Sequence, residues 1–437
     1  AIVSATLTDI DAQHCSSIDV SATHSEVKAT FVGMTDPTTG GPLTGSTADN
    51  DHTQGDQRPH VTGIFTDLTG PAAAVPGMSV HATIDDRYTT TPTALRWTAI
   101  IVGIILTLIS LIALYRLDAT DGRRHRRIFP ARWWRLNPRD AFVIITLIYW
   151  HFIGGNTSDD GYILNMARAA KHSGYMADYY RWYAAPETPF GWYYRSFGLL
   201  SEITTASPFV RIPALLCGIM VWLILSHEVL PRLGRAASQR LIPWTAALVF
   251  IAAWLPFNNG LRPEPIICLG ALLTWCSVER AIATGRVLPA AVACILGAFS
   301  VAAGPTGVMS AAAIIAGARP MMLAINRRAH VLAEIAPLEN RSGGYRISLV
   351  AVIAPVIAAG TLVIPVIFNS LTFAAFLDST RMKQKLGPSL PWWDEISMYD
   401  SLFNQSADGS IGRRFAPLAM LAGIVIVGAM LMRKGRI

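Results

Sequence analysis

The chain has 437 residues, of which 52% are hydrophobic and only 15% are charged. Its mean hydropathy is positive, a balance that a soluble domain with a water-exposed surface does not sustain, so we expect a membrane protein. The formal net charge is +7, but the basic residues lie in short runs between apolar segments rather than along one domain face. This pattern indicates membrane orientation and argues against a nucleic-acid partner.

Residues 1 to about 94 differ from the rest of the chain. Alternating apolar and polar residues at 18–31 and 60–65 predict short strands, and the Gly-, Thr- and Pro-rich stretch 36–47 predicts a turn. We therefore expect a β-rich, water-soluble domain over 1–94 and a membrane domain over 95–437 that is truncated at its C-terminus. Because the chain begins at Ala1 without a methionine or signal sequence, we also expect residues upstream.

Long apolar runs follow Arg96, and most approach the ~20 residues that a helix needs to cross a bilayer. They predict an α-helical polytopic membrane protein. The run at 141–153 is short. The nine runs are 97–115, 141–153, 207–226, 242–256, 264–278, 287–303, 308–325, 347–368 and 415–432.

Arginine and lysine fall in every second connection between these runs. If the arginine-rich loop at 116–139 is cytoplasmic, the positive-inside rule holds five times in succession along the chain. We therefore expect a multi-pass protein of the cell membrane with its chemistry on the extracytoplasmic, periplasmic face. That face would carry the β-rich domain and the loops 154–206, 257–263, 304–307 and 369–414.

Two adjacent carboxylates, Asp159 and Asp160, follow the second apolar run. Like charges side by side at a membrane boundary are costly unless a cation or hydrogen-bond donors compensate them. One carboxylate can act as a general base toward an acceptor hydroxyl, and the other can orient that hydroxyl or hold a divalent cation, Ca²⁺ or Mg²⁺, against a phosphate leaving group. The alternative is a helix N-cap formed by Ser158 or Asp159.

The same loop is crowded with aromatic residues, among which lie Arg181 and Glu187. Aromatic faces can stack on sugars, whereas an interfacial aromatic belt is the alternative. Glu187 lies between Pro186 and Pro189, which predicts a rigidly held acid. The aromatic residues are Tyr175, Tyr179, Tyr180, Trp182, Tyr183, Phe190, Trp192, Tyr193 and Tyr194.

Three further outer segments are candidates for the same site. Arg262 and Glu264 lie at the mouth of adjacent helices, where the planar guanidinium suits a phosphate, although a pair between Arg262 and Glu264 or an Asp is the alternative. The exposed amides of the turn at 304–307 could approach an anion, although a plain helix hairpin is the simpler explanation. The segment 383–395 combines lysine, tryptophan and acidic residues as in a carbohydrate- or phosphate-facing loop, and a solvated interfacial loop is the favoured alternative. The sequence contains no catalytic triad, nucleotide-binding glycine motif or zinc motif, so we expect no nucleotide cofactor.

Several motifs resemble the actinobacterial Emb arabinosyltransferases, the family targeted by ethambutol. The resemblance covers essentially everything after residue 96, and the β-rich start fits the jelly-roll-like periplasmic module of that family. The motifs are Asn156-Thr-Ser-Asp-Asp-Gly-Tyr-Ile, Met166-Ala-Arg, His172-Ser-Gly-Tyr-Met, Arg181-Trp, Pro186-Glu-Thr-Pro-Phe-Gly-Trp-Tyr-Tyr, Arg211-Ile-Pro, His227-Glu-Val-Leu-Pro-Arg-Leu-Gly, Asn259-Gly-Leu-Arg-Pro-Glu, Gly304-Pro-Thr-Gly and Asp408-Gly-Ser-Ile-Gly-Arg-Arg-Phe.

This resemblance implies a GT-C fold and the transfer of arabinofuranose from decaprenyl-phosphoryl-arabinose to the arabinan of cell-wall arabinogalactan. Asp159 matches the family's catalytic aspartate. The positions that match the donor, acceptor and drug pocket are Asp160, Tyr162, Met166, Glu187 and Tyr194, and our own reading of the loops adds Arg181, Trp192, Arg262 and Glu264 as substrate-binding candidates.

Family members are much longer, so this chain holds under half of one. The resemblance leans toward the A-type paralogue and implies a heterodimer with a paralogous Emb subunit, with an acyl carrier protein as a further candidate partner beside the membrane lipids. A non-catalytic or weakly active partner subunit of the same fold is the alternative function. A transporter would carry ionisable residues at mid-membrane, and the nine apolar runs carry almost none.

Overall fold

The computed structural model describes most of the chain, and every structural statement below concerns the described residues. These are 3–22, 26–47, 88–120, 133–157, 159–179, 182, 184–236, 239, 241–335, 344–386, 422–423, 425–426 and 429–430. The chain divides into two compact units, which are described separately. The first unit comprises Ala1–Tyr88, Ala177–Pro186 and Thr372–Trp392, and the second comprises Thr89–Met176, Glu187–Leu371 and Trp393–Ile437.

The first unit contains an antiparallel sheet of three strands in the order β1-β2-β3. Val27, Ala29, Phe31 and Met34 of the central strand are buried, as expected for a strand with one covered face. The stretch 18–31, predicted to form short strands, contains β1 and the first part of β2, so strands there are confirmed, whereas the segment 36–47, predicted as a turn, contains the strand β3. The second predicted strand, at 60–65, lies outside the described residues. The elements are α1 (Leu7–Ala12), β1 (Ser17–Ala22), β2 (Val27–Thr35) and β3 (Pro42–Ser46).

The remaining described parts of this unit are a short β-ladder and a helix. Strand β4 (Ala177–Asp178) pairs antiparallel with β5 (Ala185–Pro186), and the carbonyl of Pro186 accepts a hydrogen bond from Lys383 Nζ on α15 (Phe373–Leu386) at 2.5 Å. Tyr88 donates to Asp378 of the same helix at 2.6 Å. Lys383 thus donates to a backbone carbonyl. Residues 387–395 of the candidate segment 383–395 lie outside the described residues.

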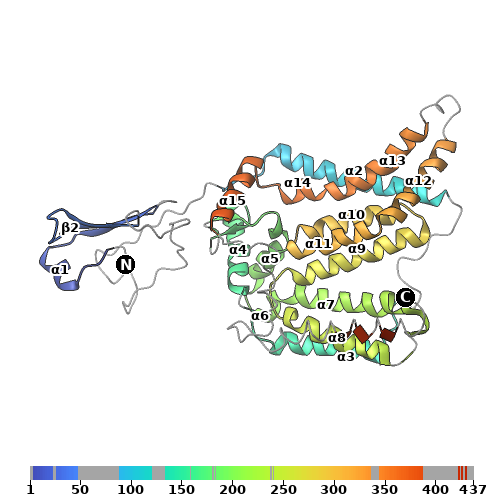
Figure 1. The fold of residues 1–437 in the computed structure, drawn as a ribbon, viewed down its shortest axis with the longest axis horizontal. Helices are drawn as coiled ribbons and strands as arrows, with labels where there is room; N and C mark the ends of the chain where they lie inside the picture. The colour runs from blue at the N-terminus through green and yellow to red at the C-terminus, as the bar shows by residue number, and fades with distance from the viewer. Residues whose placement is uncertain are drawn as a thin grey trace. The chain divides into compact units, whose positions relative to one another are not determined.

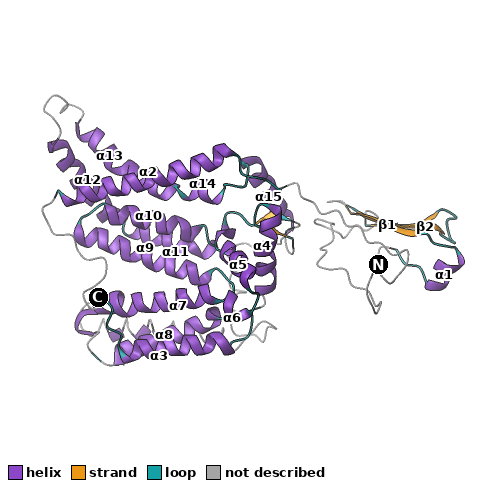
Figure 2. Ribbon diagram, turned by 180° about the vertical axis from the view of Figure 1, so that it is seen from behind, coloured by secondary structure: helices purple, strands orange, loops and turns teal. Residues whose placement is uncertain are grey.

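The second unit is a bundle of apolar helices that lie side by side in both ribbon views (Figures 1 and 2). Helices α3, α7 and α8 share one buried core, and α2, α10, α12 and α13 share another, with α9 packed against both α7 and α10. The bundle helices are α2 (Ala94–Ala119), α3 (Pro138–Ile153), α7 (Ile212–Ile224), α8 (Leu241–Asn258), α9 (Glu264–Thr284), α10 (Leu288–Val301), α11 (Val308–Ala316), α12 (Ala318–Ile335), α13 (Gly344–Thr361) and α14 (Val363–Ile367).

Among the described residues, five helices or helix combinations are long and apolar enough to cross a membrane, or six if a bent pair counts as one span. The bent pair is the predicted run 308–325, which breaks at Gly317 with an angle of 53° between Pro305–Ala316 and Ala318–Glu334. Helices α3, with 16 residues, and α10, with 14, are shorter than a full span. The ninth predicted run lies mostly outside the described residues.

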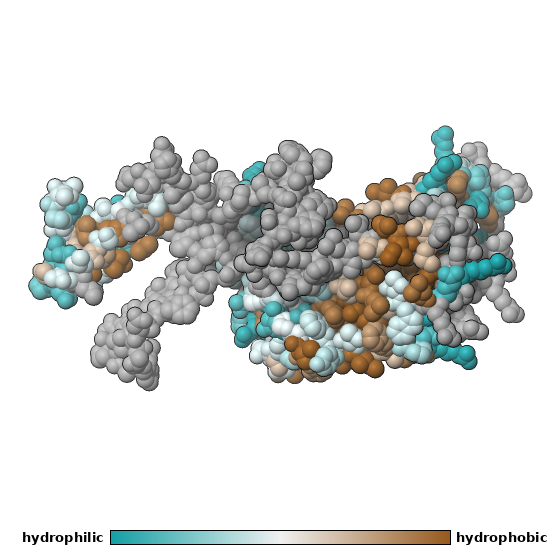
Figure 3. Space-filling model, turned by 60° about the horizontal axis from the view of Figure 1, so that its bottom comes forward, coloured by the Kyte–Doolittle hydropathy of each residue, from teal (hydrophilic) through white to brown (hydrophobic). Residues whose placement is uncertain are grey.

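The outer surface of this bundle is strongly apolar. Large hydrophobic side chains on α2, such as Ile105 and Ile109, are half exposed, an arrangement that a water-facing surface avoids and that lipid requires. On another face of this bundle, Figure 3 shows hydrophobic residues in brown across the middle, with hydrophilic residues in teal that include a group at the end to the right of the view. Smaller helices, α4 (Asp160–Ser173), α5 (Tyr194–Ile203) and α6 (Ser207–Val210), lie across the opposite end (Figure 1).

Candidate active site

The predicted acidic site lies at the first turn of α4. The backbone N–H of Asp160 donates to the carbonyl of Thr157 at 3.2 Å, and the Asp160 carboxylate accepts from the backbone N–H of Thr157 at 2.9 Å and from its hydroxyl at 2.5 Å. This reciprocal pattern resembles a capping box, with the acidic residue three positions after the threonine. Asp160, which is buried, therefore fixes the entry of the chain into α4.

Asp160 also ties the helix to the loop before α9. Its Oδ1 accepts the backbone N–H of Leu261 at 2.8 Å, across 101 positions of sequence. Gly260 lies so close that a Cβ there would be 2.6 Å from Thr157 Cγ2 and 3.2 Å from Asp160 Oδ1. The amide of Asn259 donates to the carbonyl of Gly155 in the same interface. Asp160 is thereby committed to three donors and holds two loops together.

Asp159 is different, although it is the neighbouring residue. It occupies the N-cap position of α4, but its side chain makes no capping hydrogen bond. Its carboxylate instead forms an ion pair with Nη2 of Arg262, and 28% of the side chain is exposed. Of the two acids, Asp159 is therefore the one whose carboxylate can meet a substrate. Ser158, the other predicted cap, lies outside the described residues.

Arg262 faces this carboxylate from the loop before α9. Of the two pairs that were the alternative to phosphate binding, Arg262 with Glu264 or with an aspartate, the structure contains the pair with Asp159. The Nε of Arg262 is buried and makes no hydrogen bond among the described residues. Since a guanidinium presents several donors in one plane, Arg262 has donors beyond those that face Asp159, and these can bind an anionic oxygen.

Arg211 holds the segment that leads to the two acids. It is 4% exposed, donates to the carbonyl of Gly154 at 2.8 Å and donates to Oδ1 of Asn156, which also accepts from Ser207 at 2.7 Å. Burial lowers the pKa of the Arg211 guanidinium, and the Asp160 carboxylate acts in the opposite direction. Arg211 therefore connects the end of α3, the acidic turn and the start of α7.

A hydrophobic core packs around α4, the helix that begins at the acidic turn. Met166 and Tyr194 are 2% and 5% exposed and pack with Phe197 and Leu261, while Tyr162 lies partly buried at the edge of this core. Several aromatic residues of the loop thus serve as packing, including Tyr175 and Tyr193. The substrate-binding roles of Tyr162, Met166 and Tyr194 stay predictions.

Glu187 and Trp192 lie on the segment between the β-ladder and α5. Glu187 is 9% exposed, and its backbone N–H donates to the carbonyl of Met176 at 2.8 Å, so the predicted acid is held rigidly. Trp192 donates through Nε1 to the carbonyl of Phe299 on α10 at 3.1 Å and lines a cavity of about 280 Å³. Arg195 lines the same cavity, and burial lowers the pKa of its guanidinium.

The other predicted positions differ in what the structure says of them. Glu264 is the first residue of α9, where the helix dipole favours a negative charge, and its buried Oε2 makes no hydrogen bond among the described residues. The turn at 304–307 is a short 3₁₀ segment closed by the N–H of Gly307 donating to Gly304 at 2.9 Å. Arg181 lies outside the described residues. The roles of all three stay predictions.

The acidic pair does not fit a resident divalent cation in the described residues. Metal sites of this kind need several free carboxylate or carbonyl oxygens, but Asp160 accepts from three donors and Asp159 pairs with Arg262. The described ranges hold no group of three or more His, Cys, Asp or Glu residues placed to hold a metal. The predicted cation therefore enters no step below.

Comparison with known proteins places this arrangement in a family. Residues 91–437 match the family described as "Mycobacterial cell wall arabinan synthesis protein", and residues 1–87 match an "Arabinosyltransferase concanavalin like domain". The chain belongs to this arabinan synthesis family. The predicted membership and the predicted fold class, a helical membrane protein with an N-terminal β-rich domain, are confirmed.

Individual members of the arabinan synthesis family extend far beyond this chain. The chain is 47% identical to "Probable arabinosyltransferase C" of Mycolicibacterium smegmatis, covering 100% of this chain and 39% of that protein. It is 46% identical to "Probable arabinosyltransferase B" of Mycobacterium leprae, covering 93% of this chain and 36% of that protein. The cryo-EM structure of arabinosyltransferase EmbB from Mycobacterium smegmatis matches with a TM-score of 0.64 and 40% identity, over 94% of this chain and 38% of that one. These relatives do not separate the paralogues, so the A-type assignment stays a prediction.

Sequence reasoning missed the supporting residues of the site. Thr157, Arg211 and Asn259 were present in the quoted motifs, yet no chemical function was assigned to them. The one local signal was a polar residue next to the end of an apolar helix, such as Arg211 directly before α7. The pairings themselves span 55 residues for Arg211 with Asn156 and 104 for Asn259 with Gly155, which no local pattern encodes.

Proposed function

We propose that this chain is the catalytic part of an arabinosyltransferase that extends cell-wall arabinan. Its family and the names of its relatives support the activity, and one structural observation supports the site. That observation is the different environment of the two adjacent acids. Asp160 is buried and its carboxylate accepts hydrogen bonds from the surrounding loops. The Asp159 carboxylate is partly exposed and faces only Arg262 among its described contacts.

In the proposed reaction Asp159 accepts the proton of an arabinan hydroxyl. The hydroxyl oxygen then forms a bond to the anomeric carbon of the donor arabinose, and the bond from that carbon to the lipid phosphate oxygen breaks. The electron pair leaves with the phosphate, and the free donors of Arg262 stabilise its charge. Approach of the phosphate would draw Arg262 from Asp159 and free the base at the moment it is needed.

We infer that the donor is a polyprenyl-phosphate sugar, decaprenyl-phosphoryl-arabinose. The acidic turn lies at the ends of membrane helices, which suits a ligand with its tail in lipid and its sugar in water. The cavity beside Trp192 supports this, because it combines aromatic walls from Trp97, Trp192 and Phe299 with the cation of Arg195. A prenyl-phosphate has an apolar chain that can contact the aromatic walls and an anionic phosphate that can pair with Arg195.

The test compares Asp159→Asn with Asp160→Asn in the full-length protein. Transfer from decaprenyl-phosphoryl-arabinose to a short arabinan acceptor should be abolished by Asp159→Asn, with unchanged thermal stability, because the amide cannot take the proton. Transfer retained within about tenfold, near 1.4 kcal/mol of barrier, would remove Asp159 from the base role. Complete loss in a stably folded Asp160→Asn protein would move the role by one residue.

A non-catalytic partner subunit is the second candidate function. The ion pair between Asp159 and Arg262 favours it, because an acid held by a guanidinium is not available as a base until the pair opens. In that case the wild-type chain would bind donor without transferring arabinose, and Asp159→Asn would alter neither property. The heterodimer stays a proposal. The acyl carrier protein also stays a proposal, because the arginine-rich segment 121–132 that could bind it lies outside the described residues.

We propose that the acidic turn lies on the periplasmic face of the cell membrane. In a cysteine-free background, Gly155→Cys should react with a membrane-impermeant thiol reagent in whole cells, because Gly155 is exposed beside the acidic turn. Ala283→Cys, exposed in the last turn of α9, is the matched control and should react only after lysis. The opposite labelling would invert the orientation.

A further inference from the structure

A cavity of about 630 Å³ lies at the end of α9 that is remote from Asp159. Helix α9 begins at Glu264 beside the acidic turn, and Arg280 lines the cavity sixteen residues later, about 24 Å along the helix axis at 1.5 Å per residue. The cavity is therefore separate from the proposed transfer site. Its volume lies in the range of about 300–1,000 Å³ that is usual for bound organic molecules.

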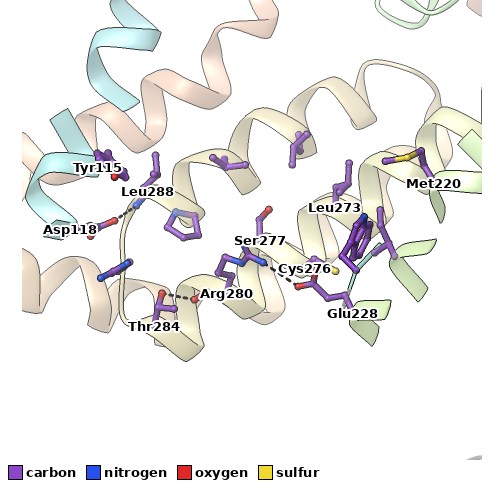
Figure 4. A pocket seen from close by; sticks show the side chains of 16 residues that line it. Tyr115, Asp118, Met220, Glu228, Leu273, Cys276, Ser277, Arg280, Thr284 and Leu288 are labelled. Atoms are coloured by element: carbon purple, nitrogen blue, oxygen red, sulfur yellow. Dashed lines mark hydrogen bonds and ion pairs between the residues drawn. The ribbon is translucent and has the colours of Figure 1, made fainter. Parts of the chain in front are cut away.

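The walls of this cavity are largely apolar and come mainly from four helices. Figure 4 shows α9 and α10 behind the cavity, with Tyr115 of α2 on one side and Met220 of α7 on the other. Met220 is 42% exposed, so the cavity also opens toward the outside of the bundle. The apolar lining residues are Trp133, Met220, Ile224, Leu273, Cys276, Leu288, Pro289, Val292 and Leu296.

One carboxylate at this cavity is neutralised by a helix end and two arginines. Asp118, the penultimate residue of α2, accepts the backbone N–H groups of Val287 and Leu288 at 3.0 and 2.8 Å, so it caps α10 from a different helix. Arg328 lies 3.6 Å from its Oδ1, and Arg286 is close enough to interact with it electrostatically. Arg286 itself lines the cavity.

The second carboxylate has a similar environment. Glu228 pairs with Arg232 at 2.8 Å and with Arg280 at 3.6 Å (Figure 4). Arg232 also pairs with Glu279 at 3.9 Å, so four guanidiniums face three carboxylates, and two of the four, Arg280 and Arg286, line the cavity. The surplus of positive charge lies beside an apolar chamber, which complements a molecule with an anionic group on a hydrocarbon chain.

We propose that this cavity binds one anionic phospholipid, with its phosphate against Arg280 and Arg286 and an acyl chain along the apolar walls. The opening at the surface of a membrane-spanning bundle lets a lipid enter from the bilayer. A soluble phosphate compound would use the arginines but leave the apolar walls without a partner, and a neutral lipid would gain no electrostatic attraction from the arginines. The site depends on the membrane-spanning fold and is independent of the proposed transfer reaction.

Native mass spectrometry of the full-length protein in neutral detergent tests this site. The protein is incubated with equal amounts of palmitoyl-oleoyl phosphatidylglycerol and phosphatidylcholine, and the retained lipid is counted. We expect phosphatidylglycerol to be retained preferentially, and Arg280→Gln and Arg286→Gln each to reduce that preference by about fivefold, the effect of one basic residue near an acidic headgroup.

Arg232→Gln is the matched control, because Arg232 pairs with the same Glu228 but does not line the cavity. It should leave the preference unchanged. Val292→Trp should abolish retention by filling the chamber, and Ser277→Leu fills it less drastically if the tryptophan variant does not fold. Equal retention of both lipids, equal loss in the Arg232 variant, or equal occupancy by glycerol phosphate alone would each overturn the proposal.

Discussion

The carboxylate of Asp160 accepts the backbone N–H of Leu261 at 2.8 Å, so the acid beside the candidate base belongs to the scaffold. Its position is reinforced by two donors from Thr157. This contact brings the loop that carries Arg262 to the start of α4. The geometry of the Asp159–Arg262 pair therefore depends on Asp160, the residue that follows Asp159.

Asp160→Asn should destabilise the protein by about 1.5–3 kcal/mol, the contribution of a hydrogen bond to a charged group. The amide keeps one acceptor oxygen, but its NH₂ group then faces a donor of Thr157 or Leu261. The measurement is a thermal melt of the full-length protein in detergent, with Asp159→Asn as the control. An Asp160→Asn protein that melts with the wild type would contradict the structural role.

Arg211→Met should lower transfer on the order of tenfold or more, because the chain before the acidic turn loses two hydrogen bonds from one buried guanidinium. Arg211→Lys should recover only part of the activity, since a single ammonium cannot reproduce the planar fork that reaches both Gly154 and Asn156.

The matched control for Arg211 is Lys171→Met. Lys171 belongs to α4 as well, but its pair with Glu202 is exposed, with 66% and 52% of the two side chains accessible. Exposed pairs contribute little, so transfer should not change. Steady-state transfer at varied donor concentration distinguishes the variants, and full activity of Arg211→Met would refute the positioning role.

The sequence was sufficient for the features that depend on composition and local pattern. Hydropathy predicted the helices α2, α8 and α9 because lipid requires continuous apolar segments, and the motif around Asp159 located the acidic site. The division of work between Asp159 and Asp160 could not be predicted, because it depends on which acid meets Leu261, a residue 101 positions away.

The sequence also failed where local pattern conflicts with packing. The apolar run at 308–325 reads as one helix, but the chain bends by 53° at Gly317, where an added Cβ would clash with Cγ1 of Val278 on α9. Likewise, the burial of Tyr194 and Met166 in one core cluster did not follow from their residue types, and their substrate-binding roles stay predictions. Burial of this kind is a property of the assembled helices.

Gly260→Ala should reduce transfer because its new methyl group would lie 2.6 Å from Thr157 Cγ2 and must displace the loop that carries Arg262. Thr157→Ser removes that Cγ2 while keeping the hydroxyl that donates to Asp160. The double variant Gly260→Ala with Thr157→Ser should therefore recover activity, and the coupling is read from a double-mutant cycle of transfer rates. Additive losses in the double variant would show that the clash is not the cause.

Asp140 should affect folding without affecting the chemistry. It is fully buried at the start of α3 and accepts from Trp222 Nε1 at 3.0 Å, from Ser226 Oγ at 2.6 Å and from the backbone of Asn137 at 2.8 Å, with His227 Nε2 at 3.1 Å. Asp140→Ala leaves these buried donors without their acceptor, a loss of about 3 kcal/mol or more.

This network lies at the π-helical turn Leu225–Val229 that follows α7, whereas Arg211 and the acidic turn lie at the other end of that helix. The expected result is a lower melting temperature and less protein in membranes, with an unchanged transfer rate per folded molecule. Glu279→Gln, half exposed on α9, is the control and should melt as the wild type does. A reduced rate in Asp140→Ala at equal folded protein would mean that the two ends of α7 are coupled, because the substitution touches neither Asp159 nor Arg262.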